Sequence, residues 1–141
     1  GVAPTIRIVL PTTPVKSHRS RILPLVSVMA ADGRIKAEER SFVERFLVEE
    51  GLEPLEDHEL RVHRPHEVGS IGTALESEKL IALMLQLAYI DQQGDSSELR
   101  VVRAFAREWG VAPERLAELE RAHQPMGWSK FVFKLKSILL G

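Results

Sequence analysis

The chain has 141 residues, of which 44% are hydrophobic and 28% charged, and this balance is typical of one globular domain with its own core. It contains no cysteine, which excludes a disulfide scaffold, a thiolate nucleophile and every metal site built on cysteine. The longest charge-free apolar runs, residues 22–31 and 80–90, are shorter than the ~20 residues that a membrane-spanning helix requires.

The net charge of -1 conceals an uneven distribution along the chain. Residues 1–21 carry four basic side chains and residues 124–141 carry three, and neither segment carries an acidic one. The stretch between them has 12 basic and 20 acidic side chains. Because such an acidic body would repel a phosphate backbone, we expect no binding of nucleic acid, whereas the basic ends could touch an anionic surface.

Apolar residues recur at helical spacing after residue 21, and no later stretch alternates with period two, so the predicted fold class is all-α. Three prolines in residues 1–21 predict an extended N-terminal arm or linker, and Pro65 with two glycines predicts a loop over residues 63–73. Helices are predicted from Ile22 to Asp32, Ala37 to Glu50, Ser77 through Ala88 as the buried centre, Leu99 to Gly110, Pro113 to His123 and after Pro125, with a short turn over residues 55–60.

The chain contains an internal repeat, visible when it is shifted on itself by 59 residues. Each copy consists of a helix, an acidic turn, a second helix and a glycine stop. Two such units, each with one apolar face, can bury these faces against each other about an approximate two-fold axis. The shift superposes Asp32 on Asp91, Glu39 on Glu98, Phe46 on Phe105, Gly51 on Gly110 and Pro54 on Pro113.

Two stretches of the repeat, MAADGRIKAEE (residues 29–39) and LAYIDQQGDSSE (residues 87–98), resemble the paired signature of the TerB-like family. This is the fold of tellurite-resistance proteins, also found in the N-terminal part of the membrane-anchored co-chaperone DjlA. The resemblance covers residues 22–120 and implies a compact bundle of about seven helices in two pseudo-symmetric halves, without catalytic activity. It also implies a role in tellurite or other stress responses, an association with the inner face of the membrane and, in some members, divalent cations.

The acidic residues of the two turns have two interpretations. In the first, they cap helices and fix the turns, as Glu39 would by accepting a hydrogen bond from the Lys36 backbone N–H. In the second, the two turns together hold a divalent cation, Ca²⁺ or Mg²⁺, because clustered carboxylates bind hard cations. The spacing does not match an EF-hand loop. The candidate metal ligands are Asp32, Glu39, Asp91, Asp95 and Glu98.

Other chemical motifs give weaker signals. His63 and His66 share a loop with Glu67, which is a combination that zinc or nickel uses, but no helix fixes their geometry and we expect a solvated loop. The sequence has no phosphate-binding glycine loop, no nucleophile elbow and no helical zinc-protease motif, so we expect no enzyme activity.

The C-terminal segment, residues 124–141, is predicted to be an amphipathic helix with two interpretations. It is either the closing helix of the core or a basic helix that lies on a membrane surface or docks on a partner. Lys130 and Lys134 lie on its polar side, toward which Phe133 also falls. The apolar face consists of Trp128, Phe131, Val132, Leu135, Ile138 and Leu139.

The sequence therefore predicts an arm over residues 1–21, a TerB-like helical domain over residues 22–123 and a C-terminal amphipathic helix over residues 124–141. The expected function is a non-enzymatic binding scaffold for a protein partner, with a groove between its halves and an optional divalent cation. The alternative is a membrane-surface or partner-docking adaptor within a larger, membrane-attached protein. The expected location is the cytoplasm, including the inner face of the membrane.

Overall fold

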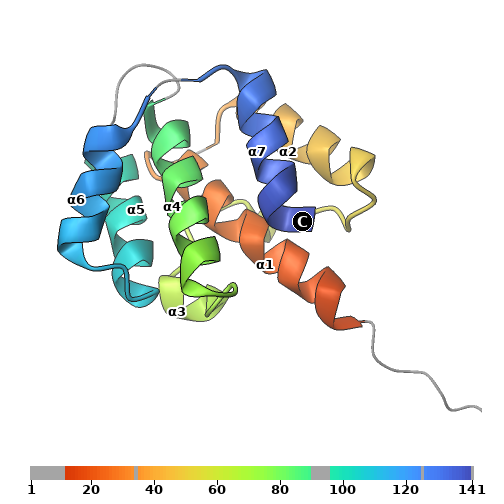
Figure 1. Ribbon diagram of the computed structural model, residues 1–141. Coiled ribbons are helices and arrows are strands. Elements are labelled where there is room, and N and C mark those ends of the chain that lie inside the picture. Colours follow the sequence, from red (N-terminus) through yellow and green to blue (C-terminus); the bar gives the residue numbers. More distant parts are fainter. Residues whose placement is uncertain (1–11, 34, 90–95, 125, 141) are drawn as a thin grey trace, which may run out of the picture.

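The computed structural model describes residues 12–33, 35–89, 96–124 and 126–140, and in these ranges the chain forms helices and turns without any strand (Figure 1). The predicted all-α class is confirmed, and the described chain contains seven α-helices. They are α1 (Thr12–Met29), α2 (Ala37–Glu49), α3 (Pro65–Val68), α4 (Ala74–Tyr89), α5 (Ser96–Glu108), α6 (Pro113–Ala122) and α7 (Trp128–Leu140), with a 3-10 helix, η2 (Asp57–Glu59), before α3.

The first helix begins earlier than the sequence predicts. α1 starts at Thr12, so residues 12–21 are helical and not an extended arm. Pro14 lies in the first turn of α1, where a backbone N–H has no acceptor within the helix, and a proline is therefore tolerated there. Pro24 lies inside α1, where it removes one helical hydrogen bond. Residues 1–11 lie outside the described residues.

Helix α3 corrects the prediction that residues 63–73 are a loop throughout. Pro65 occupies the first turn of this four-residue helix, and the Glu67 carboxylate accepts a hydrogen bond of 3.0 Å from the Arg64 backbone N–H. Gly69, with φ of 74°, ends the helix. Such a short helix depends on its caps and has too few residues to show an apolar period.

Helix α4 is the centre of the core, as its sequence predicts. It packs against α1, α5, α6 and α7, and Figure 1 shows it between α6 and α7. Because it is surrounded, it buries side chains on nearly every side. These buried residues are Ser77, Leu80, Ile81, Leu83, Met84, Leu85, Gln86, Leu87 and Ala88.

Helix α7 closes the core. Phe131 and Leu135 are fully buried and Ile138 is 9% exposed, so the centre of the apolar face of α7 lies inside the protein. Phe42 of α2 contacts α7 through the rings of Phe131, at a centroid distance of 5.9 Å, and Trp128, at 4.8 Å. Of the two interpretations of this segment, the closing helix is therefore the one that the structure shows.

The 59-residue repeat reappears in the helix boundaries. Shifting α2 by 59 residues gives the bounds of α5, and the two helices end in the same way. Gly51 has φ of 70° and Gly110 has φ of 76°, a conformation that glycine adopts without steric cost. The backbone N–H after each glycine bonds to the carbonyl five residues earlier, at 2.9 Å in both copies.

Candidate functional site

The acidic turns are only partly described, because Asp91 and Asp95 lie outside the described residues. Asp32 is exposed in the turn after α1. Glu39 is buried and accepts a hydrogen bond of 3.1 Å from the Lys36 backbone N–H, as the capping interpretation predicts. Glu98 lies in the first turn of α5, where the positive end of the helix dipole interacts favourably with its carboxylate. Among the described residues, no three carboxylate or imidazole groups are placed to hold a metal ion.

His63 is buried, although its loop was expected to be solvated. Its Nε2 donates to the Glu59 carbonyl at 2.7 Å, and its backbone N–H donates to the Ser27 hydroxyl at 2.8 Å. The Ser27 hydroxyl donates in turn to the Leu23 carbonyl at 3.0 Å. His63 therefore fastens the segment between η2 and α3 to α1, while His58 and His66 are exposed.

A cavity of about 620 Å³ lies between α4, α6 and α7. Helix α4 contributes a face with the spacing i, i+3, i+4 and i+7, from Lys79 to Gln86, and α7 contributes a similar face from Lys130 to Ser137. Its volume is within the ~300–1,000 Å³ that is usual for small-molecule sites. The lining consists of Lys79, Ala82, Leu83, Leu85, Gln86, Leu119, Ala122, His123, Gln124, Met126, Lys130, Phe133, Lys134, Ser137 and Ile138.

The charge of this cavity is positive. Lys79, Lys130 and Lys134 are exposed at its edge, and none of them has an ion-pair partner among the described residues. None of the described lining residues is acidic. Lys136, by contrast, does not line the cavity and pairs with Glu50 at 3.1 Å.

The link between α6 and α7 is tied to the central helix beside the cavity. Gln86 of α4 is 8% exposed, and its Nε2 donates to the Gln124 carbonyl at 2.6 Å. The His123 ring packs on Tyr89 at a centroid distance of 4.7 Å, and its buried Nδ1 has no hydrogen-bond partner among the residues that the structure describes. Burial lowers the pKa of His123, so its imidazole adds no charge to the cavity at neutral pH.

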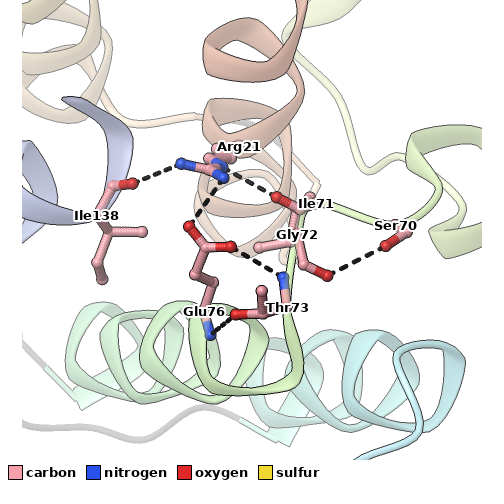
Figure 2. Close-up of polar contacts among 7 residues, drawn as sticks. All are labelled: Arg21, Ser70, Ile71, Gly72, Thr73, Glu76 and Ile138. Atoms are coloured by element: carbon pink, nitrogen blue, oxygen red, sulfur yellow. Dashed lines mark hydrogen bonds and ion pairs between the residues drawn. The ribbon is translucent and has the colours of Figure 1, made fainter. Parts of the chain in front are cut away.

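Arg21 fixes the far end of α7, as Figure 2 shows. Its Nη1 donates to the Ile138 carbonyl at 2.6 Å, its Nε donates to the Ile71 carbonyl at 3.0 Å, and its Nη2 pairs with Glu76 at 3.2 Å (Figure 2). Ile138 also lines the cavity, so this contact helps to position one cavity wall. Gly72 lies beside this cluster, and a Cβ added there would meet the Glu76 carboxylate.

The start of α4 depends on the same cluster and differs from the prediction. Ser77 was expected to cap this helix, but α4 begins at Ala74 and Ser77 is buried inside it. The Glu76 carboxylate accepts a hydrogen bond of 2.8 Å from the Thr73 N–H, and the Thr73 hydroxyl accepts one of 3.2 Å from the Glu76 N–H (Figure 2). The backbone bond from Thr73, with the nearby Arg21 charge, lowers the pKa of Glu76.

Sequence reasoning missed the cavity, because its lysines come from helices far apart in the chain. Lys79 precedes Lys130 by 51 residues, and nothing in the sequence shows that α4 and α7 lie side by side. The one available signal was the spacing of Lys130, Phe133 and Lys134 on a single helical face. Phe133 falls on that face and is 73% exposed.

No described helix is both long enough and apolar enough to cross a bilayer. Comparison with the models of known protein families, with curated proteins and with solved structures found no match to the chain.

Proposed function

We propose that the chain is a non-enzymatic binding module of the TerB-like type, in a protein of the tellurite- or stress-response kind, and that its binding surface is the cavity between α4, α6 and α7. Its ligand carries negative charge beside an apolar surface. The observation that carries this proposal is the combination of an apolar wall with three lysines at its edge that have no ion-pair partner in the described part of the chain. Removing apolar surface from water supplies the affinity, and the lysines select the sign of the charge.

The apolar wall is mainly aliphatic and partly open to solvent. Leu119, Met126 and Phe133 are at least partly exposed there, while Leu83 and Leu85 are buried residues that line it from the core side. A concave apolar surface with a few polar groups is the usual form of a ligand site. The proposal of a non-enzymatic role rests on the sequence, which has no recognised catalytic motif.

The anionic fluorescent amphiphile 8-anilinonaphthalene-1-sulfonate tests this proposal. We expect saturable binding with one site per chain. The substitution Ala122→Trp, at an exposed position of the cavity edge, should fill the space and weaken binding. Lys134→Glu should weaken binding about tenfold by reversing one of the three charges.

The matched control is Arg45→Glu, which makes the same change in charge at an exposed position of α2 outside the cavity. Its affinity for the dye should equal that of the unmodified chain. Equal losses in the Arg45 and Lys134 variants, or dye binding that does not saturate, would show that the cavity is not the binding surface.

A divalent cation at the acidic turns is a separate proposal, supported by the resemblance and by the repeated helix boundaries. Titration with Ca²⁺, Mg²⁺, Mn²⁺ and Zn²⁺ while following amide chemical shifts tests it. Shifts should concentrate at Asp32, Asp91 and Glu98, and the exposed carboxylates Glu56 and Asp57 report non-specific binding. No response at Asp32 or Asp91 at saturating metal would exclude the ion.

The second candidate function is a membrane-surface adaptor at the inner face of the membrane. The observation that favours it is Phe133, which is 73% exposed between the exposed residues Lys130 and Lys134. An aromatic side chain flanked by lysines suits the interface of an anionic bilayer. Sedimentation with phosphatidylglycerol vesicles should then show that the bound fraction falls as the salt concentration rises and falls in the Phe133→Ser variant. A bound fraction that neither salt nor this substitution changes would exclude this function.

A further inference from the structure

We propose that the cavity between α4, α6 and α7 takes the carboxylate of a single linear acyl chain. This inference rests on the proposed function, which requires only an anion with an apolar surface, and it adds the chemical class of the ligand. Three observations carry it: the aliphatic lining, the arrangement of the lysines and the fixed frame of the cavity.

The lining favours a flexible aliphatic chain over a ring system. Its apolar side chains are mainly Leu, Ile, Ala and Met, and Phe133 at the exposed edge is the one phenyl ring among the described lining residues. Sites for flat ring systems usually hold them by stacking between aromatic side chains. Unbranched, adaptable side chains such as Met126 instead follow the shape of a bent hydrocarbon.

The lysines at the edge of the cavity are placed to bind one carboxylate head group. Lys130 and Lys134 are one helical turn apart on α7, so their ammonium groups can reach the same carboxylate. Lys79 lies on α4, which packs against α7, and adds a third positive charge to the lining. The described lining offers no acidic group that would compete for these ammonium ions.

Hydrogen bonds fix two parts of the frame of the cavity. The Gln86 side chain holds the Gln124 carbonyl in the link before α7, and Arg21 holds the Ile138 carbonyl in the last turn of α7. A preformed site avoids the entropy cost of ordering its walls when the ligand enters. The volume of about 620 Å³ is within the range usual for small-molecule sites.

Displacement of the bound dye by sodium decanoate, below its micelle concentration, tests the inference in the full chain. Decanoate should displace the dye, whereas decyltrimethylammonium and decanol should displace it at least about tenfold less well, because they lack the negative charge. Affinity should rise about threefold to fourfold with each added methylene from hexanoate upward, until the cavity is filled. The aromatic anion 2-naphthoate should compete less well than decanoate.

Two variants locate the head group and the chain. The double substitution Lys130→Gln and Lys134→Gln should weaken decanoate binding by about tenfold or more and leave decanol unchanged. Ala82 lines the cavity, so Ala82→Phe should reduce its volume. The affinity for the carboxylates should then stop rising at a shorter acyl chain than in the unmodified protein. Arg45→Gln, which removes one positive charge at an exposed position outside the cavity, is the control and should change neither result.

The outcomes separate this inference from the proposed function. Dye binding can be saturable and depend on the lysines, and still not respond to decanoate or respond more strongly to 2-naphthoate. Either result would contradict the acyl ligand without contradicting the proposed binding module. Displacement by a synthetic acidic amphipathic helix alone would indicate a protein partner instead. Binding to phosphatidylglycerol vesicles without any effect of monomeric decanoate would indicate a bilayer. Absence of saturable dye binding would instead overturn the proposed function itself.

Discussion

Arg21 joins three segments of the chain through one partly buried guanidinium group, whose side chain is 13% exposed. It donates to the carbonyls of Ile71 and Ile138 and pairs with Glu76. A carbonyl that loses its donor in such a place loses a hydrogen bond without gaining full access to water. The Arg21 side chain is therefore expected to contribute far more to the free energy of unfolding than an ion pair on the surface does.

We predict that Arg21→Met lowers the free energy of unfolding by ~2–4 kcal/mol, measured by urea denaturation. The control is Arg40→Met. Arg40 pairs with Glu44 and Asp57, but its side chain is 48% exposed, so its loss should be much smaller. Equal losses in the two variants would show that the carbonyl contacts of Arg21 contribute nothing.

His123 gives a prediction about pH at the same scale. Burial lowers the pKa of His123 in the folded chain below its ordinary value of 6.5. The unfolded chain therefore binds the proton more readily, and the stabilisation associated with neutral His123 is present above pH 6.5 and is lost as the pH falls through the lowered value.

Substituting His123→Phe should accordingly reduce the loss of stability between pH 7.5 and pH 5.5, as measured by denaturation at each pH. His66→Gln is the control, since it removes an exposed imidazole in place of a buried one. A steeper pH dependence in the His123 variant would contradict the assignment, and the titration of the His123 ring by NMR checks the direction of the shift.

Helix α7 carries two phenylalanines, two positions apart, of which one lies in the core and the other faces solvent. Phe131 is fully buried, and Phe133 is 73% exposed. We predict that Phe131→Ala lowers the free energy of unfolding by ~3–5 kcal/mol, because it opens a cavity in the core. Phe133→Ala should change it by less than ~0.5 kcal/mol.

Thermal and urea denaturation of both variants measure these differences. A large loss at Phe133 and a small loss at Phe131 would mean that α7 is rotated about its axis relative to the structure described.

The glycine stops of α2 and α5 should be equivalent, because both have positive φ and the same pattern of hydrogen bonds. We predict that Gly51→Ala and Gly110→Ala each cost ~1 kcal/mol. An added Cβ has no atom within 4 Å at either site, so the cost is conformational and not steric. Denaturation of the two single variants and of the double variant should give additive losses, and strongly unequal losses would show that the two caps differ.

The helices that the sequence predicted well are those whose ends are marked by particular residues. The stops at Gly51 and Gly110 and the start at Pro113 all coincide with observed helix ends. The start of α1 was missed, because a proline in a first turn and a proline in an extended arm look alike in sequence. The start of α4 was misplaced, because its cap is Thr73, one turn before the predicted Ser77.

The candidate site was less predictable than the fold. The capping role of Glu39 could be predicted from the sequence, because it depends only on Glu39 and Lys36, which are three residues apart. The cavity depends on how α4, α6 and α7 pack, and a helical period gives the apolar face of each helix without giving its neighbours. The orientation of α7 was open for the same reason, since a buried apolar stripe and a membrane-facing one have the same pattern.

At the scale of the whole molecule, α4 is the first helix of the second copy of the repeat and packs against α1, its counterpart in the first copy. It also contacts α5, α6 and α7. The buried apolar residues form one continuous cluster that includes members of α1, α2, α4, α5, α6 and α7. Two halves that share one core are expected to unfold together.

We therefore predict a single cooperative unfolding transition, with the same midpoint for probes in different parts of the fold. Trp109 follows α5 and donates to the Gly69 carbonyl at 2.9 Å, and Trp128 contacts Phe42 of α2. Fluorescence of Trp109→Phe and Trp128→Phe variants, each compared with its own circular dichroism, measures the two regions separately. Fluorescence and circular dichroism midpoints that differ within either variant would indicate that the halves unfold independently.

Helix α7 seals the hydrophobic interior with Phe131 and Leu135 and borders the cavity with Lys130 and Lys134. An occupant held by that helix therefore favours the folded state over the unfolded one, by ~2.7 kcal/mol when its concentration is about 100 times its dissociation constant. If the cavity binds the proposed ligand, heat resistance and ligand supply are therefore coupled, and the melting temperature of the chain rises with the concentration of that ligand.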